Sequence, residues 1–137
     1  MKRTIVIIDG MGGGIGVQLI TKIKELSGDG REIIALGTNA IATERMVKSG
    51  AHRGASGENA VKVSASLGDF ILGPIGIVIP NGLMGEITPA MAEAVLCAPG
   101  ERILIPLQHD HFHLAGLEAQ PLAKLVEEAV DYLKKKF

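Results

Sequence analysis

The chain has 137 residues, with 14 basic and 15 acidic side chains and a formal net charge of −1. Apolar residues make up 47% of it and aromatic residues only 3%, so the core must be built from aliphatic side chains. The length suits one domain, 1–137, and excludes a cofactor domain joined to a separate substrate domain. The balanced charge gives no electrostatic case for a nucleic-acid partner or an anionic membrane surface.

The chain shows no pattern typical of an exported or membrane protein. Its single cysteine, Cys97, cannot form an intramolecular disulfide. The first apolar run, from Ile5 to Ile8, is too short for the core of a signal peptide, and no run reaches the length of a membrane span. We therefore expect a cytoplasmic protein in which Cys97 is a small core side chain.

In the first half of the chain, apolar patterning alternates between strand and helix periods. The run at 4–8 is β-branched and uninterrupted, which is typical of a strand buried on both faces. Thr38 or Asn39 provides a cap for a helix that ends near Lys48. Besides that helix, we expect strands at 4–8 and 32–36, and helices at 17–26 and 60–67, with a strand at 61–64 as the alternative to the last helix.

The second half continues this alternation. Thr88 followed by Pro89 is a strong helix start, a cap and then a proline at the first helical position. We expect strands at 69–72, 76–79 and 102–107, helices at 89–98 and 122–136, and an alternating segment at 109–114 that can extend a strand. Buried strands that alternate with helices predict an α/β fold, a Rossmann-like open parallel sheet of about five to six strands with helices on both faces.

A glycine-rich loop joins the first predicted strand to the first helix. Glycines let backbone amides approach a phosphate, and a helix N-terminus adds unpaired N–H groups with a partial positive charge. The alternative is a tight turn without a ligand. Asp9, just before the loop, repels a phosphate unless it is turned away or bridged by a cation. The alternative role for Asp9 is to accept hydrogen bonds from the loop amides. The candidate phosphate-binding residues are Gly10, Met11, Gly12, Gly13, Gly14, Ile15 and Gly16.

The spacing Gly10-x-x-x-Gly14-x-Gly16 after a buried strand resembles the N-terminal cofactor motif of the short-chain dehydrogenase/reductase family. The resemblance covers roughly residues 1–36 and implies NAD or NADP as the ligand, with its pyrophosphate beside the glycines. Asp9 stands where that family has Thr. The acidic ribose anchor expected after the second strand is replaced by Gly37-Thr38-Asn39. Thr38 and Asn39 are therefore candidates for contacting a ribose or a 2′-phosphate, or they form only a helix cap.

That family also has a catalytic Tyr-x-x-x-Lys pair, and the same spacing occurs at Tyr132 and Lys136. This pair lies in the last six residues of the chain, which favours a solvated helix end over catalysis. A better candidate wall for the nucleotide site is the loop after 76–79, which reaches the same sheet edge as the glycines. Glu86 in this loop is a weak candidate general acid or base. The polar or flexible positions that we expect to line this wall are Asn81, Gly82 and Glu86.

Three of the four histidines alternate with other residues, which places them on one face of a strand: His109, His111 and His113. Three imidazoles suit zinc or a similar divalent metal. Same-face neighbours on a strand are about 6.5–7 Å apart, so three ligands need a bend or a partner chain. His52, in a loop with Arg53, is a candidate fourth ligand. The alternative is an exposed polar strand.

Over its full length the chain is similar to a family of small, uncharacterised bacterial proteins. The matching segments are Gly37-Thr38-Asn39-Ala40, Gly57-Glu58-Asn59-Ala60, Gly73-Pro74-Ile75-Gly76 and Gly85-Glu86-Ile87-Thr88-Pro89. This resemblance implies a compact Rossmann-like domain and no particular reaction. Three functions stay open: binding of NAD(P) or a related nucleotide, a non-catalytic oligomeric binding or regulatory module, and a metal-dependent enzyme that uses the histidines. High apolar content in a short chain favours a homo-oligomer.

Overall fold

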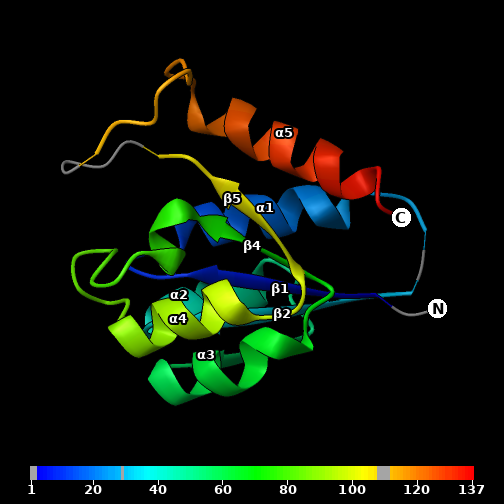
Figure 1. Ribbon diagram of the computed structural model, residues 1–137. Helices are drawn as coiled ribbons and strands as arrows, with labels where there is room; N and C mark the ends of the chain where they lie inside the picture. The colour runs from blue at the N-terminus through cyan, green and yellow to red at the C-terminus, as the bar shows by residue number, and fades with distance from the viewer. Residues whose placement is uncertain (1–2, 29, 108–111) are drawn as a thin grey trace.

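The computed structural model describes residues 3–28, 30–107 and 112–137, and in these residues a five-stranded parallel sheet lies between two layers of helices (Figure 1). The strand order is β3-β2-β1-β4-β5. The strands are β1 (Arg3–Asp9), β2 (Arg31–Gly37), β3 (Arg53–Ser56), β4 (Phe70–Pro74) and β5 (Glu101–Ile105). The helices are α1 (Gly14–Lys24), α2 (Ala40–Lys48), α3 (Glu58–Ser64), α4 (Pro89–Cys97) and α5 (Leu122–Lys134), with short 3₁₀ helices η1 (Ala65–Leu67) and η2 (Ile75–Val78).

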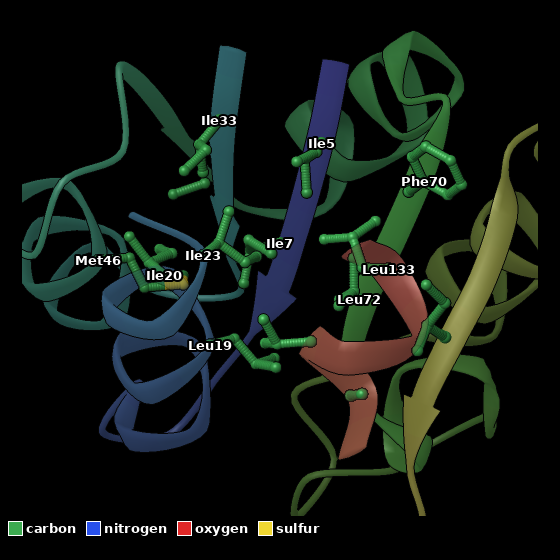
Figure 2. Close-up of a cluster of buried hydrophobic side chains, with 14 of the residues drawn as sticks. Ile5, Ile7, Leu19, Ile20, Ile23, Ile33, Met46, Phe70, Leu72 and Leu133 are labelled. Carbon is green, nitrogen blue, oxygen red and sulfur yellow. The ribbon is translucent and has the colours of Figure 1, made fainter. Parts of the chain in front are cut away.

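The two faces of the sheet carry separate cores. Helices α1 and α5 cover one face, and α3 and α4 cover the other (Figure 1). In β1, Ile5 and Ile7 pack into the first core, whereas Val6 and Ile8 pack into the second. Figure 2 shows the first core, which Met46 of α2 also enters. Burial on both faces explains why β1 is an uninterrupted apolar run, and it confirms the predicted α/β parallel-sheet class.

The helix starts agree with the capping signals in the sequence. The Asn39 side chain accepts a hydrogen bond from the Ala42 amide and caps α2. Thr88 caps α4 in the same way through the Met91 amide, and Pro89 follows it at the first helical position. Helix α1 begins at Gly14, three residues before the predicted start, because the glycines themselves enter the first turn.

Several expectations about elements are wrong. Arg53, expected in a loop with His52, instead begins the edge strand β3, where Gly54 lies opposite Ala35 of β2. The apolar run at 76–79 is mostly the 3₁₀ helix η2 rather than a strand, since burial of Ile77 makes the run apolar whatever the backbone does. The alternative strand at 61–64 is also wrong, because α3 covers those residues. Cys97 is exposed at the end of α4, not buried in the core.

Candidate functional site

The sheet order changes direction between β1 and β4. The chain passes from β1 through β2 to β3 on one side, and then returns to place β4 and β5 on the other. In open α/β sheets, ligands bind beyond the carboxyl ends of the strands at such a switch point. Three segments meet there: the glycine loop after β1, the turn after β2, and the loop between η2 and α4.

Hydrogen bonds to the Asp9 carboxylate fix the two ends of the glycine loop. Its side chain is only 3% exposed, and its two carboxylate oxygens accept hydrogen bonds from the amides of Gly10 and Gly16, both at 2.8 Å. Burial raises the pKa of Asp9, against the lowering effect of these amides, and the nearby charge of Glu86 raises it further. The alternative that the sequence offered for Asp9, an acceptor for loop amides, is therefore confirmed.

Glu86 ties the three segments together. Its Oε1 atom accepts a hydrogen bond from the Met11 amide at 2.7 Å, one from the Thr38 hydroxyl, and one from Asn39 Nδ2 at 3.1 Å. The Met11 amide contributes most to a lowered pKa of Glu86, followed by the Thr38 hydroxyl, so these donors favour the charged carboxylate. Among the residues that the structure describes, none donates to the second oxygen, Oε2.

The loop that carries Glu86 is strained and tightly closed. Asn81, Leu83 and Met84 all have positive φ angles, at 64°, 53° and 57°, which L-residues adopt only at an energetic cost. Backbone hydrogen bonds hold them there: the Asn81 amide donates to the carbonyl of Ile87 at 2.7 Å, and the Gly85 amide donates to that of Asn81 at 3.1 Å. Ile87 is fully buried and anchors the loop to the second core.

The glycines of the loop have different structural roles. A Cβ on Gly10 would lie 2.4 Å from the Thr38 hydroxyl oxygen and 2.7 Å from Glu86 Oε1, so this position must be glycine for the three segments to meet. Gly13 has φ 74° and precedes α1 as its N-cap. A Cβ on Gly14 would meet no atom within 4 Å, so the space in front of the helix start is open.

Some loop amides keep their hydrogen-bonding capacity. Within the described ranges, no oxygen accepts a hydrogen bond from the amides of Gly12 or Gly14, and both glycines are exposed. The guanidinium of Arg45, an exposed side chain in the last turn of α2, donates to the Gly12 carbonyl. The glycine loop therefore offers two free amides and holds one cation at Gly12, and backbone amides and arginine are donors that phosphate sites use.

An open cavity of about 720 Å³ adjoins the glycine loop. The residues that line it are Met11, Asn39, Ala40, Ile41, Met84 and Glu86. A larger cleft, of about 1150 Å³, lies elsewhere, between β5, the segment that follows it and α5. The smaller cavity is the one beside the switch point, so it is the one that bears on the predicted nucleotide site.

The comparison with protein families identifies the chain. A model described as "Domain of unknown function (DUF3842)" matches residues 4–137. The chain belongs to the DUF3842 family. A search of curated proteins gives no match. Membership confirms the expected resemblance to uncharacterised proteins over the full length, while the description of the DUF3842 family names no reaction and no ligand.

Of the residues predicted to line the site in this DUF3842 chain, some meet and others do not. Thr38 and Asn39 bond to Glu86, and Asn39 also caps α2, so the cap alternative holds for Asn39. Gly82 is buried, and a Cβ there would lie 2.4 Å from the Gly76 carbonyl oxygen, so it shapes the loop from inside. The atoms of this loop that approach Gly10 belong to Leu83 and Glu86.

The histidines are only partly described. His109 and His111 lie outside the described residues, so the metal site stays a prediction. His113 is exposed and lines the larger cleft. His52 has a structural role, because its Nδ1 accepts a hydrogen bond from the Ile33 amide at 3.0 Å. Among the described residues, no three His, Cys, Asp or Glu side chains gather closely enough to hold a metal ion.

Tyr132 and Lys136 lie far from the glycine loop. The Tyr132 hydroxyl donates to the carboxylate of Glu101, and Lys136 Nζ lies 3.9 Å from Glu101 Oε1. Glu101 begins β5, and because the strands are parallel, it marks the amino edge of the sheet, opposite the carboxyl edge that holds the glycines. The positions of Tyr132 and Lys136 agree with the interpretation of this pair as the end of a helix.

Sequence reasoning did not find Arg45, Ile41 or Met84. Arg45 lies six residues beyond the Asn39 cap, and no local pattern shows that its side chain turns back to Gly12. Ile41 lies between two alanines and Met84 follows Leu83, so no local pattern marks either side chain as exposed. No described helix has both the length and the apolar character needed to cross a membrane.

Proposed function

We propose that this protein binds a nucleotide, with NAD or NADP as the expected class, at the carboxyl edge of the sheet between β1, β2 and β4. The observation that carries the proposal is that, among the described residues, the amides of Gly12 and Gly14 have no acceptor, and that the Arg45 guanidinium is held at the Gly12 carbonyl of the same loop. Backbone amides and an arginine together supply both directional donors and positive charge to a phosphate. The proposal is of binding and attaches no reaction to the site.

The two carboxylates at the loop do not oppose this proposal. Asp9 is buried and its oxygens are engaged by the amides of Gly10 and Gly16. Glu86 accepts hydrogen bonds from the Met11 amide and from Asn39 in the turn after β2. Neither carboxylate accepts a hydrogen bond from Gly12 or Gly14, so those amides are available to an incoming phosphate.

The variant Gly14→Val tests the phosphate site. The added side chain enters open space, so the fold is kept, but it projects where a phosphate would approach the helix start. We expect calorimetry with NAD, NADP, ATP and FAD to find a ligand of the wild type, and Gly14→Val to weaken its binding at least tenfold. Arg45→Gln should weaken it as well, with a smaller salt dependence.

Gln18→Val is the matched control, because Gln18 is an exposed position one turn further along α1 and receives the same side chain. It should bind like the wild type. Wild-type protein that binds none of the four nucleotides below millimolar concentration, or a Gly14→Val variant that binds as tightly as the control, would show that the site is misassigned.

We also propose self-association, in keeping with the alternative of an oligomeric binding module. Strand β5 ends the sheet, and no described strand pairs with its outer edge. The larger cleft lies beside this edge, and its aliphatic lining residues are Ile103, Leu104, Leu107, Leu114, Leu117 and Leu125. Apolar side chains beside the last strand of a sheet form a surface that a second copy of the chain can cover.

Sedimentation equilibrium at tens of micromolar should give at least twice the chain mass of 14.4 kDa. Leu117→Lys, which changes a 52% exposed side chain in the cleft, should shift the equilibrium towards monomer. Leu96→Lys, at a 55% exposed position on α4, is the control and should leave it unchanged. A clean monomer in the wild type would rule out self-association.

A further inference from the structure

Three apolar side chains stand exposed around the cavity of about 720 Å³, and each comes from a different segment. Met11 of the glycine loop is 48% exposed, Ile41 at the start of α2 is 67% exposed, and Met84 of the loop before α4 is 88% exposed. Single exposed apolar residues are common on protein surfaces, but three that converge on one cavity indicate a ligand with an apolar part. Methionine side chains adapt well to a flat ring.

The backbone supports the same conclusion. Met11 and Met84 both adopt left-handed conformations, with φ 52° and 57°. Such conformations cost energy for residues with a Cβ and persist where the surrounding structure holds them, often beside a binding site. Both strained residues line the cavity.

Glu86 supplies the polar part of this cavity. Its Oε1 is occupied by three donors, from Met11, Thr38 and Asn39, whereas its Oε2 has no donor among the described residues. An ionised carboxylate oxygen accepts hydrogen bonds and donates none. A ligand group that faces it must therefore be a neutral or cationic donor such as a hydroxyl, and a second anion is repelled.

We propose that this cavity takes the nucleoside part of the ligand, with the base against Met11, Ile41 and Met84 and a ribose hydroxyl donating to Glu86. The site then selects a ribose with free hydroxyls, as in NAD, over a ribose that carries a 2′-phosphate, as in NADP. This inference rests on the proposed function, because it requires a nucleotide whose phosphates lie at the glycine loop. It gives Glu86, a residue distant from the second strand in sequence, the role of the acidic group that the end of β2 lacks.

The decisive measurement is the ratio of the dissociation constants for NADP and NAD in the wild type and in Glu86→Gln. Gln keeps the shape of the side chain and one oxygen that can accept from the Met11 amide. It removes the negative charge and puts an NH2 donor in place of the second carboxylate oxygen. We expect the wild type to bind NAD at least tenfold more tightly than NADP. In Glu86→Gln this ratio should fall at least tenfold, through weaker binding of NAD and tighter binding of NADP.

Glu44→Gln is the matched control, because it removes the same charge from an exposed position on α2 where Glu44 pairs with Lys48 at 2.8 Å. It should leave the ratio unchanged. A wild type that prefers NADP, or a Glu86→Gln variant with the wild-type ratio, overturns the inference while nucleotide binding stands. A variant that loses both ligands alike also overturns it, since Glu86 would then only shape the loop. If the wild type binds neither ligand, the proposed function itself fails.

Met84→Ala tests the base contact independently of Glu86. Met84 is the most exposed of the three side chains, so its truncation leaves the fold intact. We expect AMP to bind at least threefold more weakly to this variant, and ribose 5-phosphate to bind as it does to the wild type. Equal binding of AMP to both proteins would show that the base does not lie against Met84.

Discussion

Asp9→Ala is expected to lower the free energy of unfolding by about 3 kcal/mol, measured by urea denaturation. Asp9 is buried, and its carboxylate is the acceptor for the amides of Gly10 and Gly16. Alanine leaves both amides without their acceptor at the start of α1, and hydrogen bonds to a charged group are among the stronger ones. A loss below about 1 kcal/mol would show that water replaces the carboxylate without penalty.

The difference in free energy of unfolding between the wild type and Asp9→Ala should depend on pH, which provides a second test. Burial raises the pKa of Asp9, so the folded chain holds this proton more tightly than the unfolded chain, in which the group titrates near 3.8. The resulting stabilisation is present below the ordinary pKa and is lost as the pH rises through the raised pKa. We therefore expect the free energy of unfolding of the wild type to exceed that of Asp9→Ala by most at acidic pH, and by less as the pH rises. A difference that grows with pH would contradict the raised pKa.

The parts of the fold that sequence predicted are those with a strong local signal. Three such patterns each predict their element from a few neighbouring residues: the β-branched run of β1, the Asn39 cap and the Thr88-Pro89 helix start. Strand β3 carries no such signal, because its residues 53–56 are small or charged and it lies at the edge of the sheet. Its place is set by pairing with β2, which no short window of sequence contains.

The same distinction applies to the candidate site. The position of Asp9 beneath the glycine loop is a local arrangement of eight residues, 9–16, so the sequence could suggest it. Glu86 was visible as a polar residue in the right loop, but its bonds to Thr38 and Asn39 span 48 and 47 positions. The apolar run that contains Ile77 was predicted as a strand and is a 3₁₀ helix, because an apolar run indicates burial and does not distinguish these two structures.

Gly73→Ala is expected to destabilise the protein by about 3 kcal/mol, because its added methyl group has no room. An ideal Cβ on Gly73 would lie 2.2 Å from the carbonyl oxygen of Ile8 and 3.0 Å from Ile77 Cδ1. The first neighbour is backbone of β1, so the conflict cannot be relieved by a change of side-chain rotamer. The end of β4 must move away from β1, at the place where the strands lead into the glycine loop and the Glu86 loop.

Gly14→Ala is the control for this prediction, because its Cβ meets nothing within 4 Å and alanine is a better helix former than glycine. Urea denaturation should give this variant a free energy of unfolding within about 0.5 kcal/mol of the wild type, or slightly above it. If Gly73→Ala is as stable as this control, β1 and β4 are not packed as closely as described. If it is destabilised as expected, the separation of β4 from β1 should also weaken nucleotide binding in the folded fraction, since Glu86 and Met11 then no longer meet across the switch point.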